Sequence, residues 1–133
     1  MSSIDIAEKA TEFHMRGYNC AQSVLAACGE YTGLDEETAL AISAGFGGGL
    51  RSGEICGAIS GGVMAAGMAC PFSDSEDIEA KQKIAAIAAK LVRCCREQFG
   101  AVRCVDLKAS GVSCGEIIKE MARAAESVIL ENR

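Results

Sequence analysis

Tryptophan is absent from this sequence of 133 residues, which also holds one proline, one histidine, two tyrosines and four phenylalanines. Hydrophobic residues nonetheless make up 50% of the chain. A core without large aromatic side chains is built from Ala, Ile, Leu, Val, Met and Cys, which suit closely packed helices. The alternation of apolar and polar residues that is typical of strands is scarce as well. The sequence therefore predicts an all-α fold, and its length fits a single domain over residues 1–133.

Positive charge is in deficit. Lys and Arg number 13 against 18 Asp and Glu, which gives a formal net charge of −5. A protein that neutralises phosphates needs the opposite balance, so we expect no nucleic-acid partner. The acidic surface mainly favours solubility.

An export signal and an uninterrupted apolar segment are also missing. The first fifteen residues carry Asp5, Glu8 and Glu12 where a signal peptide would be apolar. The most apolar stretch, residues 56–72, contains four glycines and the single proline. This composition favours a buried helix over a membrane span. We therefore expect a cytoplasmic protein with no membrane partner and with reduced cysteines.

Helix caps divide the chain into segments. Asn19, Asp35 and Ser113 precede apolar stretches in the N-cap position, and Ser73 with Glu76 predicts a capping box for the longest helix. The predicted helices cover residues 3–15, 20–28, 36–44, 55–69, 74–98 and 114–130.

Small residues characterise the predicted helix over residues 55–69. Gly57, Gly61, Ala65 and Met68 recur every three or four positions and form a smooth face. Another helix can approach such a face closely, as in a helix that is buried on most sides. The sequence thus predicts a bundle of five or six helices around this central helix.

Eight cysteines fall into two groups. Cys20 and Cys114 directly follow predicted N-caps, and Cys56 lies at the start of its helix, where unpaired N–H groups favour a thiolate. Cys104 lies in a predicted loop next to Arg103, whose charge acts in the same direction. We expect these four thiols to be reactive, and Cys104 and Cys114 to form a disulfide most readily. The remaining cysteines are predicted to serve in packing: Cys28, Cys70, Cys94 and Cys95.

Several well-known motifs are missing. No C-x-x-C is present and His14 is far in sequence from the reactive cysteines, so neither a zinc finger nor a thioredoxin-type site is expected. The glycine run at 45–49 lacks the strand and the Gly-Lys-Ser/Thr of a phosphate loop. We interpret this run as a joint between helices, whose backbone can approach a sulfur and donate N–H bonds to it. The residues alone leave open a non-catalytic helical interaction domain whose cysteines only pack.

Four motifs, in this order, resemble one known family. They are G-Y-N-C-A-Q-S-V at 17–24, the glycine run followed by G-E-I-C-G-A-I-S-G-G at 53–62, F-G leading to C-V-D-L at 99–107, and Cys114 ahead of an apolar helix. Together they resemble the family of redox-active proteins named after its C…GCAxxG…C…C pattern. In this chain a glycine follows Cys56, whereas the name places the glycine before the cysteine.

The resemblance implies a small redox or electron-transfer protein in which Cys20, Cys56, Cys104 and Cys114 converge. Dithiol/disulfide pairs are one form, which needs two close thiols of unequal pKa. Ligation of an iron–sulfur cluster is the other, because a related domain in split-Soret cytochromes is associated with such a cluster. No haem-attachment C-x-x-C-H is present. The resemblance is compatible with a thiol-dependent oxidoreductase, a redox partner protein and a homo-oligomer, and it names no partner or substrate.

Overall fold

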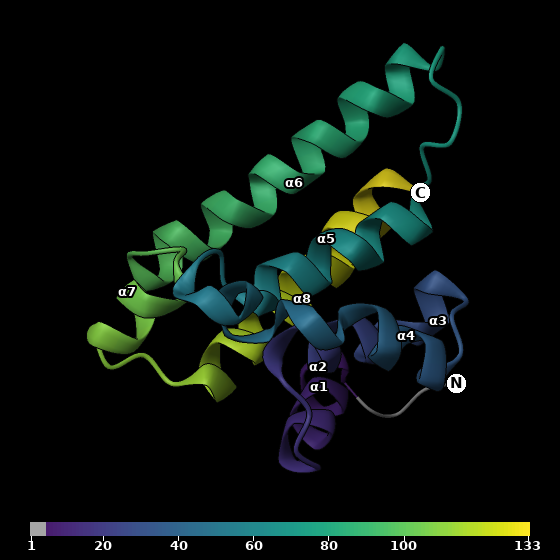
Figure 1. Ribbon diagram of the computed structural model, residues 1–133. Helices are drawn as coiled ribbons and strands as arrows, with labels where there is room; N and C mark the ends of the chain where they lie inside the picture. Colours follow the sequence, from purple (N-terminus) through teal and green to yellow (C-terminus); the bar gives the residue numbers. More distant parts are fainter. Residues whose placement is uncertain (1–4) are drawn as a thin grey trace.

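A computed structural model describes residues 5–133, and within them the fold is all α-helical (Figure 1). Two short segments, η1 and η2, form one 3₁₀ turn and one π turn. The elements in chain order are α1 Ile6–Met15, α2 Cys20–Ala27, α3 Gly29–Thr32, α4 Glu36–Ser43, η1 Ala44–Phe46, η2 Gly49–Gly53, α5 Gly57–Ala69, α6 Ile78–Phe99, α7 Cys104–Ala109 and α8 Cys114–Asn132. None of these helices combines the length and apolar character needed to cross a bilayer.

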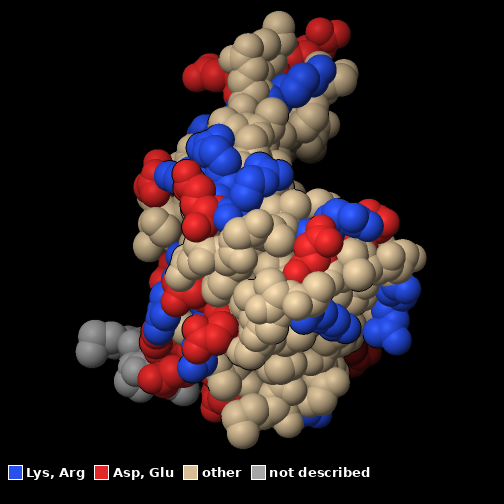
Figure 2. Space-filling model, turned by 90° about the vertical axis from the view of Figure 1, so that its left-hand side faces the viewer, with Lys and Arg blue, Asp and Glu red and all other residues tan. Residues whose placement is uncertain are grey.

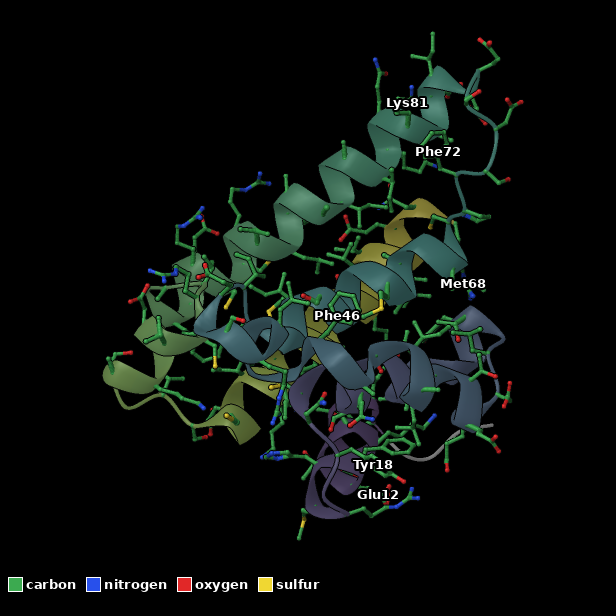
Figure 3. All side chains as sticks on the ribbon, viewed as in Figure 1. Glu12, Tyr18, Phe46, Met68, Phe72 and Lys81 are labelled. Atoms are coloured by element: carbon green, nitrogen blue, oxygen red, sulfur yellow. The ribbon has the colours of Figure 1, made fainter. Side chains whose placement is uncertain are left out.

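Helix α5 lies at the centre of the bundle, as its small residues predict. It packs against α2 on one side and against α6 and α8 on others (Figure 1). A Cβ atom added at Gly61 would lie 2.6 Å from the carbonyl oxygen of Ala21, so only glycine permits this approach of α2. Met68 departs from the prediction, because its side chain is exposed near the end of α5 (Figure 3).

The apolar stripes of α6 and α8 complete the core. Ile87, Leu91 and Cys95 are buried along α6, and Ile118 and Met121 are buried along α8. Burial of such side chains contributes roughly 1.5–3 kcal/mol each to the free energy of folding. The first turns of α6 extend beyond this core (Figure 1).

The number and limits of the helices differ in part from the sequence prediction. The one-turn helix α3 and the six-residue α7 were not expected, and the predicted start of the first helix at Ser3 lies outside the described residues. The longest helix begins at Ile78, not at 74, so the predicted capping box of Ser73 is wrong. The helix begins later because Asp77 forms the N-cap: its Oδ1 accepts a hydrogen bond of 2.9 Å from the N–H of Ala80.

Candidate functional site

The four cysteines that were predicted to be reactive line one cavity. Cys20, Cys104 and Cys114 are the first residues of α2, α7 and α8, and Cys56 immediately precedes α5. The cavity measures about 10 Å³, close to the smallest space that holds one water molecule. Four helix starts that are distant in sequence therefore deliver four thiols to one small space. The other residues that line the cavity are Leu107, Lys108, Val112 and Ile117.

A full capping box positions Cys20. The Asn19 side chain accepts a bond of 3.0 Å from the N–H of Gln22, and the Gln22 side chain accepts one of 3.1 Å from the N–H of Asn19. The Asn19 amide also donates to the carbonyl oxygen of Ala44 at 3.0 Å. These bonds fix the start of α2 against the joint that follows α4, and they confirm the cap predicted at Asn19.

The glycine joint contributes a backbone N–H to the surroundings of the Cys20 sulfur. Gly48 adopts the left-handed conformation with a φ of 63°, and its backbone N–H donates a hydrogen bond to the Cys20 sulfur. Glycine reaches this conformation without strain because it has no Cβ atom.

Cys56 and Cys104 are aligned by a short antiparallel contact between two loops. The N–H of Cys56 donates to the carbonyl oxygen of Val102 at 2.8 Å, and the N–H of Cys104 donates to that of Glu54 at 2.7 Å. These bonds flank the isolated bridge between Ile55 and Arg103. Because side chains alternate along extended backbone, Cys56 and Cys104 point to one side of the bridge, and Ile55 points away toward solvent.

No sequence pattern predicts this bridge. The paired segments are 48 residues apart and carry no strand pattern, so no local signal identifies the pairing. Cys104 consequently begins a short helix, in contrast to the predicted loop.

The Cys20 thiol is the acidic one. The Cys56 thiol donates a hydrogen bond to the Cys20 sulfur, which is the main cause that lowers the pKa of Cys20 from 9.0 to about 6. The N–H groups of Gly48 and of Cys20 itself lower the pKa further, and burial opposes them. The lowered pKa has the direction expected from the helix start of Cys20, but its main cause is the Cys56 thiol and not the helix start.

The same prediction is wrong for Cys56 and Cys114. The pKa of Cys56 is raised because its thiol donates to Cys20, and burial adds to the rise. Burial, followed by the charge on Cys20, raises the pKa of Cys114. A negative charge on one sulfur disfavours a second charge on its neighbours, so the helix starts do not each produce a thiolate. Cys20 and Cys56 form a close pair of thiols with unequal pKa values.

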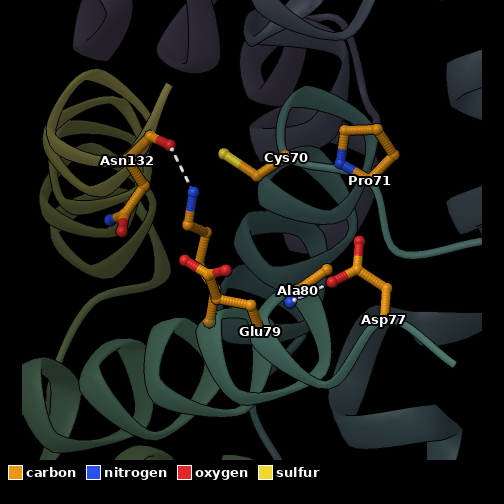
Figure 4. A pocket seen from close by; sticks show the side chains of 7 residues that line it. Cys70, Pro71, Asp77, Glu79, Ala80 and Asn132 are labelled. Carbon is orange, nitrogen blue, oxygen red and sulfur yellow. Dashed lines mark hydrogen bonds between the residues drawn. The ribbon is translucent and has the colours of Figure 1, made fainter.

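The other four cysteines lie outside this cavity. Burial raises the pKa of Cys28 to about 12 and that of Cys95 to about 11. Cys94 is half-buried on α6. Cys70 lies in a separate pocket of about 280 Å³ at the opposite end of α5, where Lys83 donates to the Asn132 carbonyl oxygen at 3.1 Å (Figure 4).

The four thiols of the cavity are also candidate ligands for a metal group. Four thiols are the donor set of many iron–sulfur clusters. In residues 5–133, however, no three Cys, His, Asp or Glu side chains are close enough together to hold one metal ion. The volume of the cavity would admit about one water molecule, which is far less space than a cluster requires. The donor type fits a cluster, and the arrangement of the sulfurs does not.

Comparison with known proteins gives one match. A family model described as "Putative redox-active protein (C_GCAxxG_C_C)" matches residues 18–128 of the chain. The matched range contains all four cysteines of the cavity. No curated protein and no solved structure matches the chain.

Proposed function

This protein belongs to the redox-active family C_GCAxxG_C_C, and we propose that it is a dithiol/disulfide protein in which Cys20 is the attacking thiolate and Cys56 its partner. The observation that carries the proposal is that Cys20 and Cys56 line one small cavity, where the interaction with the Cys56 thiol lowers the pKa of Cys20. Thiol–disulfide exchange needs a thiolate at working pH and a second thiol within reach, and this pair supplies both. We place the protein in the reducing cytoplasm with a redox partner protein, because thiol–disulfide exchange by a cysteine-rich chain needs an environment in which its thiols are regenerated.

The exchange proceeds in two balanced steps. The Cys20 thiolate attacks one sulfur of a disulfide on the partner, the partner's S–S bond breaks, and one partner sulfur leaves as a thiolate. The hydrogen bond to the Cys20 thiolate, the main cause that raises the pKa of Cys56, is lost when Cys20 enters the mixed disulfide. Cys56 then loses its proton to the departing thiolate and attacks Cys20, which breaks the mixed disulfide and releases the second partner sulfur as a thiolate. The products are a Cys20–Cys56 disulfide and a partner dithiol, and the reverse direction oxidises the partner.

This order of reactivity differs from the sequence prediction. We expect Cys20–Cys56 to be the first disulfide, ahead of Cys104–Cys114, because the pKa of Cys114 is raised and that of Cys20 is lowered. Cys104 and Cys114 then act as a second dithiol that can exchange with the first pair in the same cavity.

Mass spectrometry of the oxidised protein tests the proposal. Reduced protein is exposed to a limiting amount of a small disulfide, the free thiols are blocked, and the disulfide-linked peptides are identified. We expect Cys20–Cys56 to dominate in the wild type and in the control Cys94→Ser, and to be absent in Cys20→Ser. A dominant disulfide through Cys94 or Cys95, or eight unreacted thiols, would contradict the proposal and favour an interaction domain.

The second candidate is ligation of an iron–sulfur cluster by Cys20, Cys56, Cys104 and Cys114. The four thiols that line one cavity supply its donor set, and this small cavity would have to open to admit the cluster. Iron content and the visible absorption spectrum of protein purified without oxygen separate the two candidates. Colourless, iron-free protein with reversible thiol oxidation supports the dithiol, and stoichiometric iron with charge-transfer bands supports the cluster.

A further inference from the structure

A second hollow adjoins the cysteine cavity. This outer pocket, of about 380 Å³, lies between η2 and α7 and is lined by Gly48, Arg51, Gly53, Cys104, Val105 and Lys108. The face that carries α7 is turned toward the viewer in Figure 2, where Lys and Arg as well as Asp and Glu side chains are scattered over a broad uncharged area.

Two residues connect the outer pocket to the cysteine cavity. Cys104 and Lys108 line both spaces. Cys104 is otherwise buried, with 8% of its surface exposed. A molecule in the outer pocket therefore lies next to a thiol that also borders the Cys20–Cys56 pair.

The outer pocket is positively charged in an acidic protein. The chain carries a net charge of −5, yet no acidic residue lines this pocket. The nearby Arg103 is neutralised by Glu54 at 3.4 Å and Asp106 at 3.8 Å. Arg51 and Lys108, in contrast, have no carboxylate within salt-bridge distance among residues 5–133. Their positive charges are therefore available to bind an anion.

The backbone at the rim of the outer pocket is unusual. Leu50 and Arg51 have φ values of 61° and 57°, in the left-handed region that residues with a Cβ atom seldom adopt. The turn is closed by a bond of 3.0 Å from the N–H of Glu54 to the carbonyl oxygen of Gly49. Such conformations cluster at ligand-binding sites, where they orient a side chain. Here the turn sets Arg51 at the edge of the pocket.

We propose that the outer pocket binds a small disulfide that carries carboxylate groups, with Arg51 and Lys108 holding the carboxylates and Cys104 beside the S–S bond. This inference rests on the proposed dithiol function and adds the class of oxidant. The Cys104 sulfur, after losing its proton to solvent, attacks one substrate sulfur and releases the other half as a thiolate.

The second half of the substrate leaves by exchange within the cavity. The Cys20 thiolate attacks Cys104 in the mixed disulfide and expels the second substrate thiolate. Cys56 then loses its proton to the departing substrate thiolate and attacks Cys20, which breaks the Cys20–Cys104 bond, restores the Cys104 thiolate and leaves a Cys20–Cys56 disulfide. One substrate disulfide is reduced to two thiols, and one protein dithiol is oxidised.

The test compares disulfides of different charge. Oxidation of the reduced wild type is timed with dithiodiglycolate, an anion, and with bis(2-hydroxyethyl) disulfide, which is neutral. Each rate is divided by the rate at which the same disulfide reacts with 2-mercaptoethanol, which corrects for the intrinsic reactivity of the two disulfides. Electrostatic attraction of this kind raises association rates by about 10- to 1,000-fold. We expect a ratio of anionic to neutral rates of about ten in the wild type, which falls to near one in the double variant Arg51→Gln/Lys108→Gln.

A control variant and a trapping experiment complete the test. The control Lys81→Gln removes one positive charge beside Phe72, at the far end of α6, and should keep the wild-type ratio (Figure 3). In the double variant Cys20→Ser/Cys114→Ser, which lacks both thiols proposed to exchange with Cys104, the mixed disulfide with dithiodiglycolate should accumulate on Cys104. An unchanged ratio in the double variant, or an adduct on another cysteine, overturns the inference and leaves the dithiol function intact. Wild-type protein that forms no Cys20–Cys56 disulfide with either probe refutes the function itself.

Discussion

The acidity of Cys20 can be measured directly. Its pKa is lowered from 9.0 to about 6, chiefly by the hydrogen bond from Cys56. At pH 5.5 a thiol of pKa 6 is ionised about 700 times more than one of pKa 9. A thiolate of lower pKa is also a weaker nucleophile, by about 15- to 30-fold over three units at a Brønsted coefficient of 0.4–0.5. We therefore expect Cys20 to react with iodoacetamide about 30-fold faster than an ordinary thiol at pH 5.5, and at a similar rate near pH 8.

The perturbation is Cys56→Ala, which removes the donor. The apparent pKa of Cys20 should then rise from about 6 toward 9.0, because the main cause of its lowering is gone. The rate of alkylation is measured from pH 4.5 to 9.5, and the modified peptide is identified by mass spectrometry. Cys94→Ala serves as the matched control, since Cys94 lies on α6 outside the cavity.

Two results would refute this reasoning. A wild-type midpoint for Cys20 near 9 would show that the cavity does not stabilise a thiolate. A low midpoint that stays the same in Cys56→Ala would show that helix α2 and Gly48 suffice, and that the two thiols are not coupled. Circular dichroism of each variant establishes that the compared proteins are folded alike.

Three predictions concern stability and are read from denaturant unfolding. Gly61→Ala should destabilise the fold by about 1–3 kcal/mol through overpacking against α2, whereas Gly67→Ala, which meets no atom within 4 Å, should stabilise it by about 0.5–1 kcal/mol. Asp77→Ala should lower the free energy of unfolding by about 0.5–2 kcal/mol, and Ser73→Ala should leave it unchanged; equal losses would reject Asp77 as the cap. The pKa of Cys28 is about 12 in the folded protein against 9.0 when unfolded. Its contribution to the free energy of unfolding is therefore complete below pH 9 and is lost as the pH rises toward 12. Between pH 9 and 12 the free energy of unfolding of the wild type should thus fall by up to about 1.4 kcal/mol per pH unit more than that of Cys28→Ala. Parallel pH profiles of the two proteins would contradict the raised pKa of Cys28.

Local signals in the sequence predicted most of the fold. The cap at Asn19 and the small residues of α5 depend on neighbours within a few positions, and both predictions are confirmed. The start of α6 was misplaced because Ser73 and Asp77 both offer cap-forming side chains, and only the conformation of the exposed loop decides between them. The short α7 was missed since Arg103, its N-cap residue, makes no side-chain cap bond that a motif could reveal.

The membership of the cavity was predictable, and the order of reactivity within it was not. Each of Cys20, Cys56 and Cys114 was judged from its own helix start, where backbone N–H groups favour a thiolate. Where these helix starts meet, however, the hydrogen bond to Cys20 and burial raise the pKa of Cys56, and burial followed by the charge on Cys20 raises that of Cys114. Cys20 gains the charge because it also receives bonds from Gly48 and from Cys56, both supplied by segments distant in sequence. Selection of one thiolate among several similar cysteines is therefore a property of the tertiary fold, and this selection gives the proposed redox pair its direction of attack.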